Sequence, residues 1–108
     1  MPRLRFHSVD HDKVKAASKG LGKDLAEILN IGPEHFFLEC MSSNFIYDGE
    51  DITSFPFVEV HCFDRGTEAF DRMAKVITQH MLAAGCQSVD VAFILMQRRH
   101  YYEDGKHL

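Results

Sequence analysis

Alternating apolar and polar positions mark two of the segments that we expect to be β-strands. In 3–7, Leu4 and Phe6 point to one face and the polar residues to the other. Segment 57–63 alternates in the same way, and one of its faces carries Val58, Val60 and Cys62. Segments 35–41 and 89–96 are apolar at most positions, which predicts two further strands. A short arm at 44–47 followed by Asp48-Gly49 predicts a hairpin.

Apolar residues recur every three or four positions in two longer segments, the spacing of an amphipathic helix. The first helix is expected to begin after Asp10, an N-cap residue, and to run to about Leu29, before Gly32-Pro33. The second is expected from Thr67 to about Ala84. Strand–helix–strand therefore occurs twice, with Phe57 and Thr67 following Pro2 and Asp12 by 55 positions.

We predict an α+β fold made of a duplicated βαβ unit in a single domain, 1–108. The first unit and its hairpin occupy 2–48, the second unit 57–96, and a polar tail 97–108. Because βαβ crossovers are right-handed, both helices are expected on one face of a four-stranded mixed sheet. The other face is left uncovered, where Phe57 and Phe63, or Phe37 and Met41, would meet water. Such a patch favours an oligomer over a monomer.

Composition and charge exclude several classes of protein. The net charge of −4 and the pI near 5.9 argue against a nucleic-acid partner. The longest apolar run, Val91–Met96, is too short to span a membrane, and the N-terminus lacks the apolar region of a signal peptide. We therefore expect a cytoplasmic protein.

Cysteine and histidine spacing gives no sign of a metal or cofactor. The three cysteines form no C-x-x-C pair, so we expect free, buried thiols. The seven histidines include no pair spaced as metal ligands on one helix. His61 and Cys62 are not expected to form a dyad, because neighbouring residues of a strand point to opposite faces.

Pro2 is the candidate for catalysis. Met1 precedes a small residue, the context in which the initiator is normally removed, and removal would leave a free secondary amine at the start of a strand. An α-amino group titrates near about 8, and burial or a nearby cation such as Arg3 or Arg5 lowers this pKa. Such an amine is suited to moving protons at neutral pH. Taken by itself, a proline at this position can instead have a purely structural role, because it favours an extended backbone.

Pro2 combined with the duplicated βαβ unit resembles the tautomerase superfamily, which includes 4-oxalocrotonate tautomerase and macrophage migration inhibitory factor. The resemblance spans MPRLRF, FVEVHCF and VDVAFILM, from Pro2 to about Met96. It is strongest to the long, fused members and to a bacterial branch whose activity is not assigned. It implies a homotrimer in which Pro2 is the general acid/base of keto–enol exchange on a small carboxylate.

The cation that family isomerases use to hold an anionic substrate is missing from its usual places, where this chain has residues such as Asp10, Gly32 and Glu39. Arg65, between the third strand and the second helix, is the candidate replacement; it could equally be a surface arginine that pairs with Asp64. Tyr47 and Tyr101 are candidates to line the site from a neighbouring subunit, or else they pack at a subunit contact.

The leading hypothesis is a tautomerase-like trimer in which Pro2 isomerises a small carboxylate. One alternative is a trimeric binding or assembly module that kept the fold and lost the chemistry. Another is a ferredoxin-like monomer with the same order of elements, serving as a small-molecule-binding domain.

Overall fold

The elements of the chain follow the order strand–helices–strand, hairpin, strand–helix–strand. The structure, a computed structural model, describes residues 2–108. The strands and helices are β1 Arg3–His7, α1 His11–Ser18, α2 Leu21–Leu29, β2 Phe37–Cys40, β3 Phe45–Tyr47, β4 Glu50–Ile52, β5 Phe57–Phe63, α3 Thr67–Ala83, β6 Asp90–Met96, β7 Tyr102–Glu103 and β8 Lys106–His107. Two short 3-10 helices, Pro33–His35 and Arg98–His100, precede β2 and β7.

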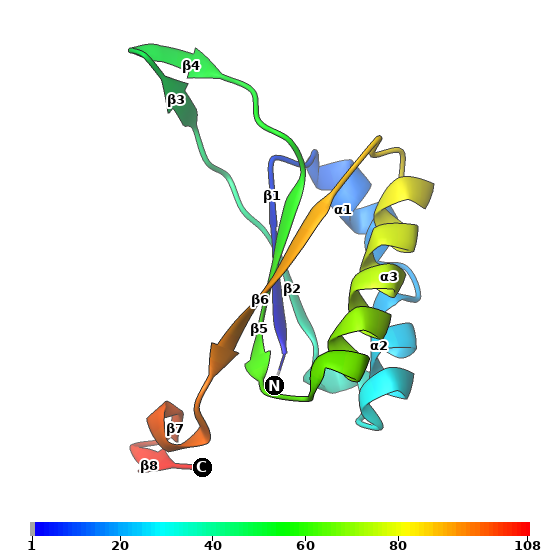
Figure 1. The fold of residues 1–108 in the computed structure, drawn as a ribbon, viewed down its shortest axis with the longest axis vertical. Coiled ribbons are helices and arrows are strands. Elements are labelled where there is room, and N and C mark those ends of the chain that lie inside the picture. Colours follow the sequence, from blue (N-terminus) through cyan, green and yellow to red (C-terminus); the bar gives the residue numbers. More distant parts are fainter. Residues whose placement is uncertain (1) are drawn as a thin grey trace.

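The four main strands form one mixed sheet in the order β2-β1-β5-β6. Each βαβ unit contributes a parallel pair, β1 with β2 and β5 with β6, and the two units join through antiparallel β1 and β5. All three main helices lie on one face of this sheet (Figure 1). The α+β, duplicated βαβ architecture is therefore confirmed. A ferredoxin-like arrangement does not occur, because the two strands of each unit are direct neighbours here.

The first helix is two helices, so the prediction of a single helix from Asp10 to Leu29 was wrong. Lys19 leaves the helical conformation, with a ψ of 115°, and Gly20 has a φ of +75°. A left-handed residue interrupts the helical backbone, and glycine adopts it without steric cost. The apolar stripe still continues across the break, because α1 and α2 both turn their apolar residues toward the sheet.

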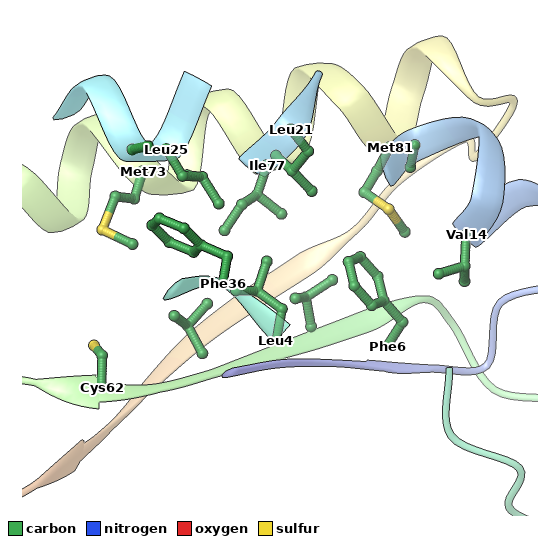
Figure 2. Close-up of a cluster of buried hydrophobic side chains, with 14 of the residues drawn as sticks. Leu4, Phe6, Val14, Leu21, Leu25, Phe36, Cys62, Met73, Ile77 and Met81 are labelled. Atoms are coloured by element: carbon green, nitrogen blue, oxygen red, sulfur yellow. The ribbon is translucent and has the colours of Figure 1, made fainter. Parts of the chain in front are cut away.

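The core lies between the helices and the covered face of the sheet (Figure 2). From the sheet come Leu4 and Phe6 of β1 and the three alternate residues of β5, all nearly inaccessible to solvent. From the helices come Val14, Ala17, Leu21, Leu25, Met73, Ile77 and Met81. The alternation of apolar and polar residues in β1 and β5 therefore identifies the face of each strand that is buried in the core. Burial of these apolar side chains supplies most of the stabilisation.

The uncovered face of the sheet is mainly charged, whereas we expected an apolar patch. Arg3, Arg5 and His7 of β1 lie on it, beside Glu59 and His61 of β5. Glu39 of β2 also lies there.

The four apolar residues predicted for this face occupy positions on it, but their side chains differ in exposure. Phe37 is half exposed, and Phe57 and Met41 are partly buried. Phe63 is only 7% exposed. The Arg98 guanidinium lies 4.8 Å from the centre of the Phe63 ring, and Tyr101 packs edge-on against the same ring.

Two small hairpins project from opposite ends of the sheet (Figure 1). The first, β3–β4, turns at Asp48 and Gly49, both with positive φ, as their sequence predicts. The second, β7–β8, was not predicted, although it turns at Asp104-Gly105 with the same backbone. Its strands have two residues each, too few to show an alternating pattern.

Candidate functional site

Pro2 directly precedes β1. It lies at the end of the sheet where β1 begins and the antiparallel strand β5 ends. Its side chain is fully buried, and its carbonyl oxygen accepts a hydrogen bond of 3.1 Å from the Phe37 N–H. The register pairs Arg3 with His61, so the chain before Arg3 runs beside the last residues of β5. Met1, whose removal would free the Pro2 nitrogen, lies outside the described residues.

A pocket of about 250 Å³ opens on the uncovered face beside this end of the sheet. Its lining comes from three strands and the tail: Arg3, Arg5, His61, Met96 and Tyr101. Pro2 is not among the described residues that line the pocket: its side chain is fully buried, whereas Arg3, the next residue, lines the pocket. The volume lies below the roughly 300–1,000 Å³ of typical sites for drug-sized ligands, so a ligand of few atoms fits it best.

The pocket carries positive charge. Arg3 Nε and Arg5 Nε lie 3.3 and 3.4 Å from the same oxygen, Oε1 of Glu39. One carboxylate thus faces two guanidinium groups, and none of the described lining residues is acidic. Arg5 Nε and Glu39 Oε1 are both buried without a hydrogen-bond partner, so they interact through their charges. Guanidinium groups in such a place favour a carboxylate or another oxyanion.

His61 connects the pocket to a second acidic group. Its Nε2 lies 3.6 Å from Oε2 of Glu59 and makes no hydrogen bond in the described structure. The other oxygen of Glu59 lies 2.6 Å from Nε2 of His7. Glu59 therefore lies between two histidines. As predicted, His61 and Cys62 point to opposite faces, since His61 is partly exposed and Cys62 is 1% exposed.

Arg65 follows β5 at the same end of the sheet as Pro2, but it is not among the described residues that line the pocket. Its Nε is buried without a hydrogen-bond partner. Burial raises the pKa of the Cys62 thiol, and the positive charge of Arg65 offsets part of this rise. The charge of Arg65 thus acts on Cys62, whose side chain lies on the core side of the sheet.

The two candidate tyrosines are far apart. Tyr101 lines the pocket and packs on Phe63 with their ring centres 5.6 Å apart. Tyr47 lies in β3, 72% exposed, on the hairpin that projects from the opposite end of the sheet (Figure 1). Within one chain, the structure brings Tyr101 to the Pro2 end and leaves Tyr47 distant from it.

Four residues that line the pocket were not identified as binding residues from the sequence: Arg3, Arg5, His61 and Met96. Arg5 and His61 occupy the polar positions of alternating strands, which normally indicate only a solvated face. Their meeting depends on the antiparallel register of β1 and β5, which pairs Arg3 with His61. The alternation alone does not give this register.

Two other classes of feature are absent from the described part of the chain. Among residues 2–108, no three His, Cys, Asp or Glu side chains gather in a way that could hold a metal ion. No helix in this range is long and apolar enough to cross a membrane.

Comparisons with known proteins place the chain in a family. Residues 1–107 match the family described as "Domain of unknown function (DUF1904)". The crystal structure of a DUF1904 domain from Sebaldella termitidis is 30% identical, with a TM-score of 0.89 over 100% of both chains. No curated protein matches the sequence.

More distant structures share the fold. The macrophage migration inhibitory factor-like protein of Entamoeba histolytica is 10% identical, with a TM-score of 0.70 over 99% of this chain and 98% of that one. A fused 4-OT described as an asymmetric trimer is 13% identical, with a TM-score of 0.75 over 97% and 94%. The chain belongs to the DUF1904 family and has the fold of the tautomerase superfamily.

Proposed function

We propose that the protein is a tautomerase-like isomerase in which the amine of Pro2 moves a proton on a small enolisable carboxylate. The observation that carries the proposal is the pocket whose lining includes Arg3, the residue directly after the buried Pro2. Arg3 and Arg5 line it from the same strand that Pro2 begins, and no acidic residue is among its described lining. A base and an anion-binding group are thereby held on one rigid element.

Burial of Pro2 supports a role as a base at neutral pH. Its side chain is excluded from solvent, and the two nearest cations in sequence are Arg3 and Arg5. In the form that begins at Pro2, desolvation and nearby positive charge would both favour the unprotonated amine. In ketonisation the amine would take the proton of the enol hydroxyl and deliver a proton to the adjacent carbon, so an O–H bond is broken, a C–H bond is formed and the amine is regenerated.

The substrate carboxylate would bind to Arg3 and Arg5, with Tyr101 beside it. Two guanidinium groups against Glu39 leave one positive charge for the ligand. Arg65 is a further cation at this end of the sheet. Tyr47 would reach such a site only from a neighbouring copy, because its hairpin projects from the other end (Figure 1).

Self-association as a homotrimer is part of the proposal. The sheet has two open edges, β2 and β6, and apolar side chains are exposed on the first hairpin and on β6: Ile46, Ile52, Ile94 and Leu95. Exposed apolar residues beside open edges favour a protein partner, and a fused 4-OT with this fold is described as a trimer. Light scattering tests the oligomeric state. A mass of three times 12.4 kDa is expected, and the mass of a single chain would contradict the trimer.

Ketonisation of phenylenolpyruvate tests the reaction with three forms of the protein. The form that begins at Pro2 should be active. The form that retains Met1 keeps the ring but turns the amine into an amide, and it should be inactive. Pro2→Ala should lose most of the activity. Equal rates in all three forms contradict catalysis by the Pro2 amine.

Binding of the carboxylate is tested separately with Arg5→Met and Arg65→Met. We expect Arg5→Met to raise KM by roughly tenfold or more, the scale of one lost charge-assisted hydrogen bond. A larger effect of Arg65→Met on KM would indicate that the substrate carboxylate binds to Arg65 instead. A folded trimer without turnover on any enol substrate would support the alternative, a binding or assembly module that has lost the chemistry.

A further inference from the structure

A second pocket on the uncovered face lies at the opposite end of the sheet from Pro2. It has a volume of about 370 Å³, within the roughly 300–1,000 Å³ range of small-molecule sites. Its described lining comes from β1, β3, β5, β6 and the segment before β5: His7, Phe45, Ser54, Phe55, Phe57, Glu59 and Asp90. None of these residues lines the pocket at the Pro2 end, although Glu59 lies 3.6 Å from His61, which does.

Three phenylalanines give this pocket aromatic walls. Phe45 and Phe57 are partly buried, whereas Phe55 is 56% exposed. Phe57 also stacks on His7, with 5.9 Å between the ring centres. Exposed aromatic rings around a hollow are costly in water, so a ligand with an apolar body would be stabilised by covering them.

The charge of the pocket is negative. Glu59 and Asp90 are among its lining residues, and neither lysine nor arginine is among those described. Glu59 is held by a 2.6 Å hydrogen bond between its Oε1 and His7 Nε2. Asp90 is exposed at the start of β6, and its carboxylate makes no ion pair with any of residues 2–108. The pocket therefore has an uncompensated carboxylate beside aromatic rings.

We propose that this pocket binds an organic ammonium ion with an apolar body. The faces of aromatic rings attract cations, and a carboxylate beside them neutralises the charge that enters. The three phenylalanines would contact the carbon skeleton, and Asp90 would receive the ammonium group. An anionic ligand is disfavoured here by Glu59 and Asp90, in contrast with the arginine-lined pocket at the Pro2 end.

Calorimetric titration with three probes of similar shape tests the charge preference. Phenethylammonium should bind, neutral 2-phenylethanol should bind at least about fivefold more weakly, and phenylacetate should bind least. Equal affinity for the ammonium and the alcohol would mean that only the apolar body is recognised, and it would overturn the proposal. The reaction at Pro2 is not involved, so failure of either proposal leaves the other standing.

Two pairs of variants locate the site. Asp90→Asn should weaken phenethylammonium binding by about five- to tenfold, whereas Asp71→Asn, exposed in α3 on the helical side of the sheet, should leave it unchanged. Phe55→Ala should weaken binding, whereas Phe37→Ala, similarly exposed at the other end of the sheet, should not. Absence of binding in the assembled protein would overturn the proposal.

Discussion

His7 Nε2 and Glu59 Oε1 lie 2.6 Å apart across β1 and β5, the two strands that join the halves of the molecule. The register pairs Glu59 directly with Arg5, so the bond to His7 runs diagonally between the strands. Both side chains are about four-fifths buried, at 19% and 24% exposure. Glu59 thus connects the polar face of the sheet across the junction of the two βαβ units.

Removal of the Glu59 carboxylate should weaken this junction. We expect Glu59→Ala to lower the free energy of unfolding by about 1–3 kcal/mol, because His7 loses its hydrogen bond in a partly buried place. Urea denaturation measures the change. Glu50→Ala, exposed in β4, is the control and should change it by less than about 0.5 kcal/mol. An equal effect of the two substitutions would show that the bond contributes little.

Two glycines near the break between α1 and α2 should respond in opposite ways to alanine. Gly20 has a φ of +75°, so Gly20→Ala should destabilise the protein by about 1 kcal/mol through backbone strain alone. A Cβ there would have only ordinary contact with His80, at 3.8 Å. Gly22 is helical, and Gly22→Ala should stabilise by about 0.5–1 kcal/mol. Thermal unfolding of both variants checks the sign of each change.

Gly20 also shows where sequence reasoning reached its limit. Val14, Ala17, Leu21 and Leu25 keep a helical spacing across the break, so periodicity alone predicts one continuous helix. An isolated glycine in such a stripe is usually tolerated within a helix, and only the positive φ shows that this one ends it. The predicted strands, by contrast, were confirmed because Leu4 and Phe6 alternate with charges over a buried face.

The candidate site was predictable only in part. Pro2 and Tyr101 were identified from the sequence, and the structure places Tyr101 in the pocket beside the strand that Pro2 begins. The arginine pair was considered only as neighbours of Pro2. Its convergence on Glu39 depends on the parallel pairing of β1 with β2, where Arg5 lies opposite Glu39. Strand register joins residues far apart in the chain, and no local pattern encodes it.

Burial distinguishes two leucines of similar size on the helical layer. Leu25 is inaccessible to solvent in α2, whereas Leu82 is 46% exposed in α3. Leu25→Ala should cost about 2–5 kcal/mol, since it removes buried methyl groups and leaves a cavity. Leu82→Ala should change the free energy of unfolding by less than about 0.5 kcal/mol in a single chain. A large cost for Leu82→Ala in the assembled protein would place α3 in a contact between copies.

Cys62 should make the protein less stable as the solution becomes alkaline. Burial raises the pKa of its thiol above 9.0 in the folded chain, so the unfolded chain loses this proton first. The contribution to stability is therefore complete below pH 9.0, and it declines as the pH rises from there toward the folded pKa, by at most about 1.4 kcal/mol per pH unit. Denaturation between pH 8 and 10 should show a shallower decline for Cys62→Val than for Cys40→Val, in which an exposed thiol is removed instead. Identical slopes would mean that the Cys62 thiol ionises equally in the folded and unfolded chains.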